Sequence, residues 1–452
     1  MISSQLLGEI VPTVEKLRWM IAHGEQALQP EQRYGQGLLV LHKKAYIEYR
    51  PLPVLAIFAP NNYPYTNAMN HVISGCFAGC GVVIKVSEFT SWSARLILRI
   101  VRKALVEVGG DPELVQIVTG MAKTGEALCR SKNIDKIIFT GSDKIGKIIS
   151  RQASDNLTPC VLELGGKDPF IVFGDVNLDR VCDIAGRGVF QNAGQNCIGI
   201  ERIFVEKPIE KAFIDRMVAI ASKIRVGKPI NQEGRVYDLG ALCTPPQIAH
   251  VESLIKDAVS KGAILHFGGK RITNLGPGLF FEPTVISNIN TSMRIAHEEV
   301  FGPVCAIRSF QTEEELIQMV NDCPFALGSS VFSRSSKRMK RVASCIQTGM
   351  VNCNDFGVNY LVQSLPFGGT KASGYGRFGG EEGLRACCQL VAVTEDYSSL
   401  AETSLPGPFK YPIAQNSPEA TGGLIELAYG DCITVKLPGL KTLLMGLIFP
   451  KY

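Results

Sequence analysis

The sequence predicts an α/β protein with two parallel β-sheets, each covered by helices, and a small β arm. The main observation is an alternation of short apolar runs with helix-length segments, which starts near Pro53 and is typical of parallel sheets. Chain length is a second observation, because 452 residues exceed what one hydrophobic core usually holds. A hydrophobic content of 46% with 45 glycines fits such an architecture.

The first half of the chain is expected to form one sheet with its helices. A helix is expected over 9–27, followed by a strand pair at a surface edge over 37–50. The apolar runs then predict strands at 54–58, 82–86, 114–118, 136–139 and 159–164. The segments between them predict helices at 66–76, 93–106, 125–130 and 145–153. Ligands of such a sheet bind at the carboxyl ends of its strands.

The second half repeats the alternation with different spacing, which predicts a second α/β domain that begins near Gly166. Strands are expected at 170–173, 201–206, 304–310, 330–332 and 350–353. Helices are expected at 178–190, 209–224, 246–261, 313–320 and 336–345.

Residues 397–452 have a different character. Four prolines between 406 and 418 predict a loose connector, and an apolar end follows at 440–449. That end is too short to span a bilayer. Packing on the core is favoured for it, while contact with a membrane surface or with a partner stays open.

Composition excludes several classes of protein. The 47 basic and 42 acidic residues give a net charge of +5 without a long single-sign run, which is no footprint for nucleic acid. The fourteen cysteines contain no Cys-x-x-Cys, so reduced thiols in an intracellular, cytoplasmic setting are expected. The six histidines form no ligand pattern, and no metal site is expected.

Two residues 34 positions apart suggest covalent chemistry on a carbonyl. Cys197 follows the polar turn Gly-Gln-Asn, although most cysteines are small buried apolar residues. Glu163 stands in an apolar strand, where a carboxylate is costly unless it is paired or functional. A thiol that attacks and a carboxylate that later activates water would suit a thioester mechanism.

The sequence contains three candidate nucleotide-binding patterns, which differ in strength. The run Gly374-Tyr-Gly-Arg-Phe-Gly379 spells G-x-G-x-x-G, but it follows no expected strand and is assigned to a loop. Lys85 and Glu88 stand at the carboxyl end of a strand, although an ordinary exposed pair is the favoured reading of these two residues alone. Gly141 and Ser142 open a helix, where a phosphate is favourable.

These pieces, taken in order, resemble the NAD(P)-dependent aldehyde dehydrogenase superfamily over about residues 10–396. The resemblance is carried by PNNYP (60–64), KVSE (85–88), FTGS (139–142), LELGGK (162–167), GQNC (194–197), EEVFGP (298–303), VN (351–352) and PFGGTKASG (366–374).

The resemblance implies a catalytic set. Cys197 matches the nucleophile and Glu163 the general base of the family. Asn62 matches the side chain that, together with a backbone N–H, holds the oxyanion. The implied reaction is the oxidation of an aldehyde to a carboxylic acid through a hemithioacetal and a thioester on the cysteine.

The resemblance also implies a nicotinamide cofactor. Lys85 and Glu88 match contacts to the adenosine ribose, and the carboxylate favours NAD over NADP because it would repel a 2′-phosphate. Ser142 matches a pyrophosphate contact, and Glu299 and Phe301 match contacts to the nicotinamide ribose and ring.

The implied organisation has four parts. Residues 1–36 and 52–165 are expected to form a Rossmann-like NAD-binding domain, and 166–386 a catalytic domain. Residues 37–51 and 387–396 are expected to form an oligomerisation arm, and 397–452 a C-terminal extension. The family pairs strands across subunits, which predicts a homodimer or a tetramer through about 38–50 and 388–394.

The chain departs from the usual pattern in three ways. Too little chain precedes Pro60, the tail beyond 396 is longer, and Asn61 and Tyr63 replace the commoner tryptophan and phenylalanine. These features suggest a divergent eukaryotic branch with a shortened N-terminus. A full-length form with a hydrophobic anchor would be associated with the endoplasmic reticulum or another membrane.

Two alternatives to this interpretation remain open. In a CoA-acylating relative, CoA replaces water, but such enzymes generally lack a base at the position of Glu163. A non-catalytic homologue is suggested by the shortened start and opposed by the intact catalytic set. The aldehyde itself is not specified by the sequence.

Overall fold

The structure, a computed structural model, describes residues 6–35, 40–230, 234–398 and 405–449. The chain forms two compact units. The first comprises Met1–Ala27 and Pro51–Cys388, and the second comprises Leu28–Arg50 and Gln389–Tyr452. Parts of the expected arm (37–39) and of the expected extension (399–404 and 450–452) lie outside the described residues.

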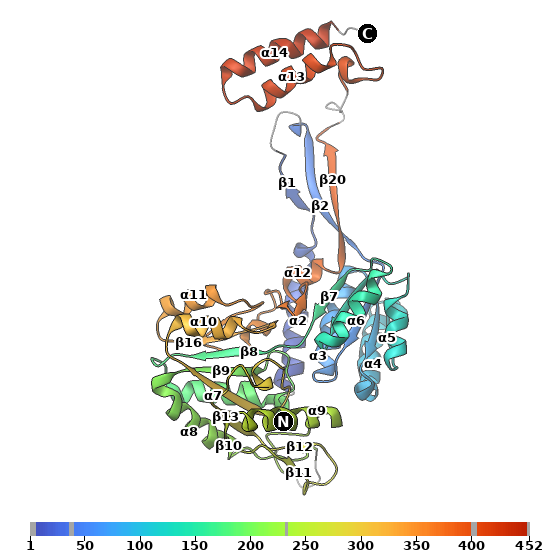
Figure 1. Cartoon of the computed structure of the whole chain (residues 1–452). Helices are drawn as coiled ribbons and strands as arrows, with labels where there is room; N and C mark the ends of the chain where they lie inside the picture. Colours follow the sequence, from blue (N-terminus) through green and yellow to red (C-terminus); the bar gives the residue numbers. More distant parts are fainter. Residues whose placement is uncertain (1–5, 36–39, 231–233, 399–404, 450–452) are drawn as a thin grey trace. The chain divides into compact units, whose positions relative to one another are not determined.

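The first sheet of the larger unit confirms all five strands that the sequence predicts for it (Figure 1). Its strands run parallel except β19, which pairs antiparallel with β7. In spatial order they are β19 (Gly374–Tyr375), β7 (Cys160–Glu163), β6 (Lys136–Thr140), β3 (Val54–Ala59), β4 (Gly81–Val86) and β5 (Val115–Val118). The central β3 is buried almost throughout, as a continuous apolar run predicts.

Helices link these strands as expected, namely α3 (Pro64–Ala78), α4 (Ser91–Glu107), α5 (Ala122–Cys129) and α6 (Asp143–Ser154). In α6, Gly146, Ile149 and Ala153 form the buried stripe, while the lysines and Arg151 face outward. The N-terminal segment consists of a π-helical turn, Leu6–Ile10, and α2 (Val11–Ala27), which packs against α3 and against α12 (Gly380–Arg385).

The second sheet has two strands that the sequence analysis missed, β10 and β13. Its order is β10 (Ile264–Phe267), β13 (Thr284–Ser287), β14 (Val304–Phe310), β9 (Ile200–Glu206), β8 (Asp168–Val172), β16 (Ser330–Phe332) and β17 (Asn352–Cys353). Only β10 runs antiparallel to its neighbour. The missed strands are four residues long each, which is too short for a clear pattern, and β10 is mostly exposed although three of its four residues are apolar.

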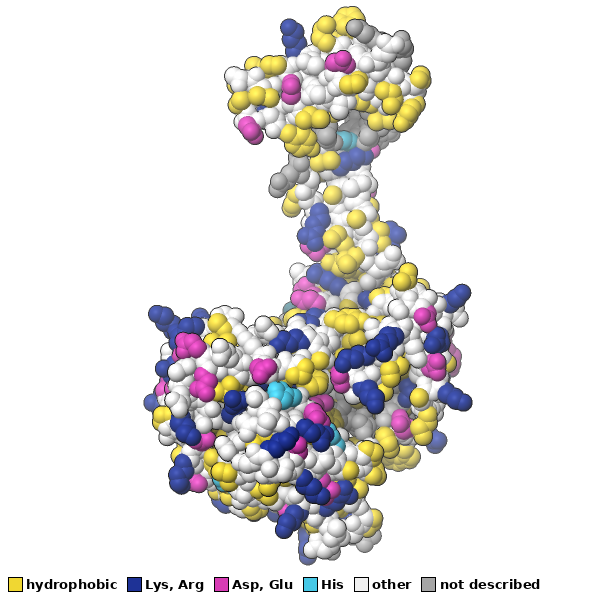
Figure 2. Space-filling view, in the orientation of Figure 1, with side chains coloured by type: hydrophobic (Ala, Val, Ile, Leu, Met, Phe, Trp, Pro, Cys, Tyr) yellow, Lys and Arg dark blue, Asp and Glu magenta, His cyan; other side chains and the backbone are white. Residues whose placement is uncertain are grey.

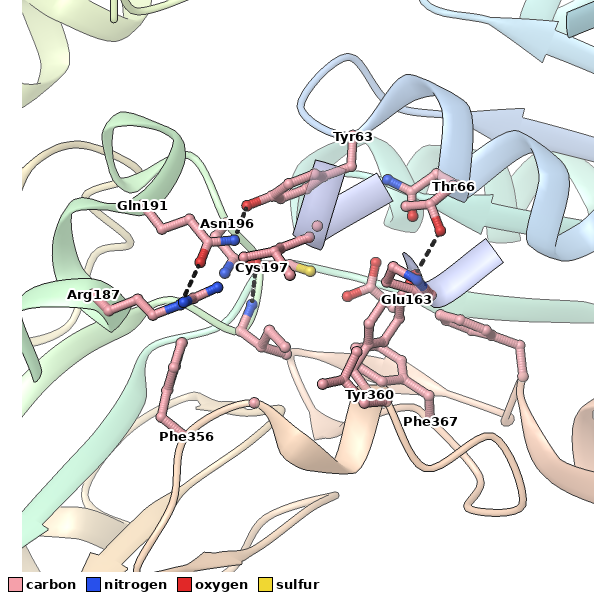
Figure 3. A pocket seen from close by; sticks show the side chains of 18 residues that line it. Tyr63, Thr66, Glu163, Arg187, Gln191, Asn196, Cys197, Phe356, Tyr360 and Phe367 are labelled. Carbon is pink, nitrogen blue, oxygen red and sulfur yellow. Dashed lines mark hydrogen bonds between the residues drawn. The ribbon is translucent and has the colours of Figure 1, made fainter. Parts of the chain in front are cut away.

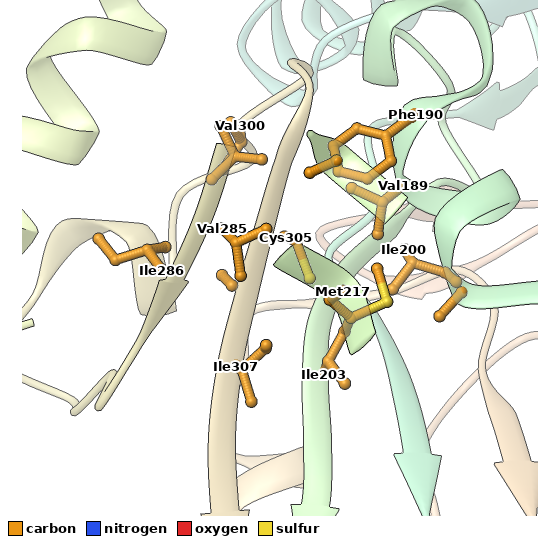
Figure 4. Close-up of a cluster of buried hydrophobic side chains, with 14 of the residues drawn as sticks. Val189, Phe190, Ile200, Ile203, Met217, Val285, Ile286, Val300, Cys305 and Ile307 are labelled. Carbon is orange, nitrogen blue, oxygen red and sulfur yellow. The ribbon is translucent and has the colours of Figure 1, made fainter. Parts of the chain in front are cut away.

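The helices of this half match the expected positions and cover its core. They are α7 (Leu178–Phe190), α8 (Glu210–Ala221), α9 (Pro245–Ser260), α10 (Glu313–Asn321) and α11 (Ser336–Cys345). Figure 4 shows part of the core, where Met217 of α8 and Val189 of α7 lie beside side chains from three neighbouring strands, including Ile203, Cys305 and Val285. Small pairings complete the unit: β11 (Arg271–Ile272) with β12 (Phe280–Phe281), and β15 (Phe325–Ala326) with β18 (Thr370–Lys371).

The G-x-G-x-x-G run is not simply the loop that the sequence analysis expected. Gly374 lies opposite Glu163 in the β19–β7 pair, and its φ is 103°. A Cβ there would lie 2.0 Å from the carbonyl oxygen of Leu162. Glycine is therefore required because the two backbones approach closely, and this positions the residues around Glu163.

The smaller unit contains a three-stranded sheet and a helical hairpin. The sheet order is β1 (Glu31–Arg33), β2 (Lys43–Pro51) and β20 (Cys388–Asp396). The expected strand pair within 37–50 is wrong, because one long strand occupies 43–51 and its partner β1 begins earlier. Since β2 and β20 join within one chain, their pairing with a second subunit stays a prediction.

The connector expected around the prolines at 406–418 ends slightly earlier than predicted, because a helix begins at Ser417. Helices α13 (Ser417–Tyr429) and α14 (Ile433–Ile448) pack against each other. Prolines did not prevent this, since Pro418 occupies the first turn of α13. The apolar end forms most of α14, and Figure 2 shows apolar side chains on the surface of this hairpin. Among the described residues, no helix combines the length and the apolar character that crossing a bilayer requires.

Gly374→Ala is expected to lower the free energy of unfolding by about 3 kcal/mol, because it adds a steric collision to a strained φ. Gly109→Ala is the matched control, since Gly109 has a φ of 73° but a Cβ added there would have no atom within 4 Å. That control should cost about 1 kcal/mol. Chemical denaturation of both variants measures the difference, and equal losses would contradict the close-approach argument.

Candidate active site

A cavity of about 130 Å³ lies where the N-terminal segment, α3, α7 and the loop before β9 converge (Figure 3). It has room for a small organic molecule, since one water needs only about 10–15 Å³ of such volume. Glu163 and Cys197 both line it. The structure therefore brings together the two residues on which the predicted chemistry depends.

Glu163 is the last residue of β7, and its side chain is buried. Burial raises the pKa of its carboxyl to about 8, while a hydrogen bond with the Cys197 thiol acts in the opposite direction. Its Oε1 atom has no hydrogen-bond partner among the described residues. The carboxyl is therefore mostly protonated at neutral pH and has one free oxygen facing its surroundings.

Cys197 is half-buried at the end of a strained loop. The three residues Asn192, Ala193 and Gly194 all have left-handed φ values, 54°, 57° and 74°. A Cβ on Gly194 would lie 2.0 Å from the carbonyl oxygen of Gly302, so this position also requires glycine. The pKa of the Cys197 thiol is raised well above its usual value, first by burial and then by the nearby Glu163 carboxylate.

Asn62 lies against this loop, although it is not among the described residues that line the cavity. Its side-chain Nδ2 donates to the backbone carbonyl oxygen of Gln195 (3.2 Å), and its backbone carbonyl oxygen accepts from Nδ2 of Asn192 (3.0 Å). The side-chain amide thus holds the nucleophile loop, with one Nδ2 hydrogen left for another acceptor.

The glycine pair after β7 lets two other functional groups approach. A Cβ on Gly165 would lie 2.4 Å from Oε2 of Glu299, and a Cβ on Gly166 would lie 2.2 Å from the carbonyl oxygen of Cys197. Glu299 also accepts the Gly166 N–H through Oε1 (3.0 Å). Burial raises the pKa of the Glu299 carboxyl to about 8. One dipeptide therefore contacts both the expected nucleophile and an expected cofactor ligand.

A buried ion pair that the sequence analysis missed fixes the turn that carries Phe301. Lys167 Nζ lies 2.7 Å from Oε2 of Glu201, and both side chains are almost fully buried. Glu201 also accepts the backbone N–H groups of Val300 and Phe301. The available signal was a charge beside or within two neighbouring apolar strands, namely Lys167 just before β8 and Glu201 in β9.

The expected ribose ligands lie at the carboxyl edge of the first sheet. Lys85 Nζ and Oε2 of Glu88 are 3.9 Å apart. Glu88 borders a second cavity of about 290 Å³, whose apolar walls include Leu98 of α4 and Ile117 of β5. A carboxylate beside apolar side chains suits ribose hydroxyls next to an adenine ring, so these residues could hold the adenosine part of a nicotinamide dinucleotide.

The expected phosphate ligands lie at the start of α6. Ser142 caps this helix, and its Oγ accepts the N–H of Ile145 (3.4 Å). The N–H of Gly141 donates to the carbonyl oxygen of Glu163 (3.0 Å). A Cβ on Gly141 would meet the Phe139 ring at 2.5 Å, which gives this glycine a packing reason besides access for a phosphate.

Several residues of the cavity wall escaped the sequence analysis. Phe356 and Tyr360 belong to none of the recognised motifs, so nothing local predicted them. Phe367 and Phe378 stand in PFGGTKASG and in the G-x-G-x-x-G run, but neither motif was connected with this cavity. Arg187 and Gln191 had a signal, since they stand four residues apart near the end of the helix that leads into the Cys197 loop.

Known proteins resemble this chain over most of its length. Residues 2–393 match the aldehyde dehydrogenase family. An aldehyde dehydrogenase-like protein of Schizosaccharomyces pombe is 40% identical over 432 residues, which cover 95% of this chain and 82% of that protein. Betaine aldehyde dehydrogenase 1 of Oryza sativa subsp. japonica is 37% identical over 82% of this chain and 72% of its own length.

Solved structures agree with this result. Betaine aldehyde dehydrogenase of Staphylococcus aureus, in complex with NAD⁺, superposes with a TM-score of 0.76 at 32% identity. That match covers 84% of this chain and 73% of the other. The chain belongs to the aldehyde dehydrogenase family and is an oxidoreductase of that family.

Proposed function

We propose that this chain oxidises an aldehyde to a carboxylic acid with NAD, through a thioester on Cys197. The observation that carries the proposal is the meeting of the Glu163 carboxyl and the Cys197 thiol in one largely apolar cavity. NAD is supported by the carboxylate of Glu88 beside the second cavity and by the NAD⁺ complex of the Staphylococcus aureus relative.

The first half of the reaction begins when the Cys197 thiol gives its proton to solvent water. Cys197 Sγ then bonds to the carbonyl carbon, and the electron pair of the C=O bond moves to oxygen. The free hydrogen of the Asn62 amide and a backbone N–H of the loop are the donors proposed to stabilise this charge. When bound, the nicotinamide ring supplies the two-electron acceptor that the oxidation requires. The oxidised adduct is a thioester on Cys197.

The second half uses Glu163 as a base. Its ionised form, the minor form at neutral pH, takes a proton from water while the water oxygen bonds to the acyl carbon. The C–S bond breaks, and the departing Cys197 sulfur takes that proton from Glu163. The products are a carboxylic acid and the Cys197 thiol, and Glu163 is again ionised. A buried base beside the thiol favours this hydrolysis over transfer to CoA. It also argues against a non-catalytic homologue, since such a chain has no need for a costly buried carboxyl.

Assembly remains part of the proposal. A homo-oligomer is consistent with the family, and the sheet of β1, β2 and β20 is the proposed interface. The contact of the C-terminal extension with a membrane surface stays a prediction.

Alkylation should reveal the coupling between thiol and carboxyl. Labelling of Cys197 by iodoacetamide is expected to be slow at pH 7 and to accelerate as pH rises, because only the thiolate reacts. Glu163→Gln should shift this profile to lower pH, with the largest difference above pH 8, where Glu163 is charged in the unmodified protein. Peptide mass spectrometry provides the rates, with the exposed Cys353 as internal control. Identical profiles for both proteins would contradict the proposed pairing.

Pre-steady-state kinetics should separate the two half-reactions. Glu163→Gln is expected to give a burst of about one NADH per site and then to stall, because acylation proceeds and hydrolysis does not. Cys197→Ser should give no burst, whereas Cys76→Ser, remote from the cavity, should behave as the unmodified protein. Stopped-flow absorbance at 340 nm measures the burst. If the burst were absent in Glu163→Gln, Glu163 would act in an earlier step than hydrolysis of the thioester.

Cofactor choice should depend on Glu88. Glu88→Gln is expected to narrow the preference for NAD over NADP by about tenfold, equivalent to about 1.4 kcal/mol, since a carboxylate no longer faces the 2′-phosphate. Equilibrium binding of both cofactors, followed by protein fluorescence, tests this without turnover. Glu107→Gln on α4 removes the same charge elsewhere and serves as control. Equal affinity of the unmodified protein for both cofactors would refute the assignment.

A further inference from the structure

The wall of the catalytic cavity contains a guanidinium without an acidic partner. Arg187 lies in the last turn of α7 and lines the cavity. Its Nε donates to Oε1 of Gln191 (3.3 Å). Within the described part of the chain, no carboxylate oxygen lies within the 4.0 Å of an ion pair with Arg187. The terminal nitrogens of this side chain thus remain free to bind an acceptor.

Gln191 orients this guanidinium toward the cavity. Its Nε2 donates to the hydroxyl of Tyr63 (3.3 Å), so Arg187, Gln191 and Tyr63 form one hydrogen-bonded row (Figure 3). Tyr63 in turn packs against Gly8, where a Cβ would approach the ring to 2.8 Å. The fork of Arg187 is therefore held by a packed scaffold, which reduces the entropy lost when an anion binds.

The charges of the cavity are unevenly arranged. Glu163 is the one acidic side chain among the described residues that line it, and it lies beside Cys197. In the view of Figure 3, Arg187 and Glu163 lie on opposite sides of Cys197. The wall between them is largely aromatic, with Phe356 and Tyr360 prominent. A substrate whose aldehyde lies at Cys197 can thus place its far end at a positive charge.

We propose that Arg187 binds a carboxylate at the end of the substrate remote from the aldehyde. The preferred substrates would then be aldehydes that also carry a carboxylate, and cationic aldehydes would be disfavoured. This specificity differs from what the names of the betaine aldehyde dehydrogenase relatives suggest, since betaine aldehyde carries a positive charge. The inference rests on the proposed aldehyde oxidation and concerns the same cavity.

The mechanism of selection is electrostatic and geometric. A planar guanidinium can bind a carboxylate through two parallel hydrogen bonds, and aromatic walls around the substrate limit the screening of this charge by water. Because Arg187 is exposed to solvent, only a moderate effect of about tenfold on kcat/KM is expected, mainly through KM, since the contact forms in the ground state as well.

Three benzaldehydes of similar size test the proposal. They carry a para carboxylate (4-formylbenzoate), a para methyl ester (methyl 4-formylbenzoate) or a para trimethylammonium group. The unmodified protein should prefer them in that order. Arg187→Met should lower the carboxylate-to-ester ratio of kcat/KM about tenfold and raise the relative rate of the cation. Arg187→Lys should restore part of the ratio, because it keeps the charge without the fork.

The control removes the same charge elsewhere. Arg151→Met on α6 lies outside the cavity lining and should leave both ratios unchanged. If Arg187→Met does not fold, ionic strength provides a second measurement on the unmodified protein. The KM for 4-formylbenzoate should rise with salt while the KM for the ester stays constant. A ratio that neither Arg187→Met nor salt changes would overturn the assignment.

A binding measurement separates this inference from the proposed function. Monomethyl terephthalate carries a carboxylate but no aldehyde, and it should protect Cys197 from iodoacetamide better than dimethyl terephthalate does. Arg187→Met should abolish that difference. Turnover of none of the benzaldehydes, with protection intact, would contradict aldehyde oxidation and leave the anion site standing. Turnover of all three with equal protection by both esters would overturn the anion site alone.

Discussion

The site depends on a carboxyl and a thiol that share a place from which water is largely excluded. Burial disfavours the charged form of each, and the charge of either one disfavours ionisation of the other, so the resting pair is neutral. Keeping both groups buried requires that the chain surround them closely. Glycines at 165, 166, 194 and 374 meet this requirement, because each occupies a point where a Cβ would collide with a neighbouring group. The substrate cavity is what remains open beside the pair.

The residues that hold the site in place are polar, and their buried charges and hydrogen-bonding groups are paired with one another. The Lys167–Glu201 ion pair connects the first residues after β7 with the turn at Val300 and Phe301, and removal of one partner of such a pair typically costs about 3–5 kcal/mol. Arg202 adds three hydrogen bonds to backbone carbonyl oxygens, two of them in α10. The left-handed Asn192 and Ala193 before Cys197 are strained at about 1–3 kcal/mol each, and hydrogen bonds from Asn62, Asn192 and Gln195 hold the loop in place. Rigidity at the site thus comes from residues that take no part in the chemistry.

Residue patterns were sufficient to predict the structural features that depend on neighbouring residues in the chain. Apolar runs such as 54–58 predicted the strands of the first sheet, and the setting of Glu163 and Cys197 predicted that both belong to a site. Features that arise from contacts distant in sequence were missed. The strand β19 forms because its backbone pairs with β7, which residue propensities do not predict. The strand β13 likewise depends on its pairing with β14. The start of the α13–α14 hairpin was obscured by a run of prolines, the last of which, Pro418, is tolerated in the first turn of α13. The aromatic wall could not be inferred, since Phe356 and Tyr360 reach Cys197 only through the folding of the second half.

The glycine pair at 165 and 166 has a thermodynamic consequence. The side chain of Glu299 contacts this dipeptide at Gly165, and the backbone of Cys197 contacts it at Gly166. A negative charge on Glu299 raises the pKa of the Cys197 thiol. Any molecule that changes the charge state of Glu299 when it binds therefore changes the proton affinity of the thiol. Linkage is reciprocal, so ionisation of the Cys197 thiol changes the affinity for that molecule by the same factor. Two residues without side chains thus let Glu299 lie close enough to the thiol for the two groups to be coupled electrostatically.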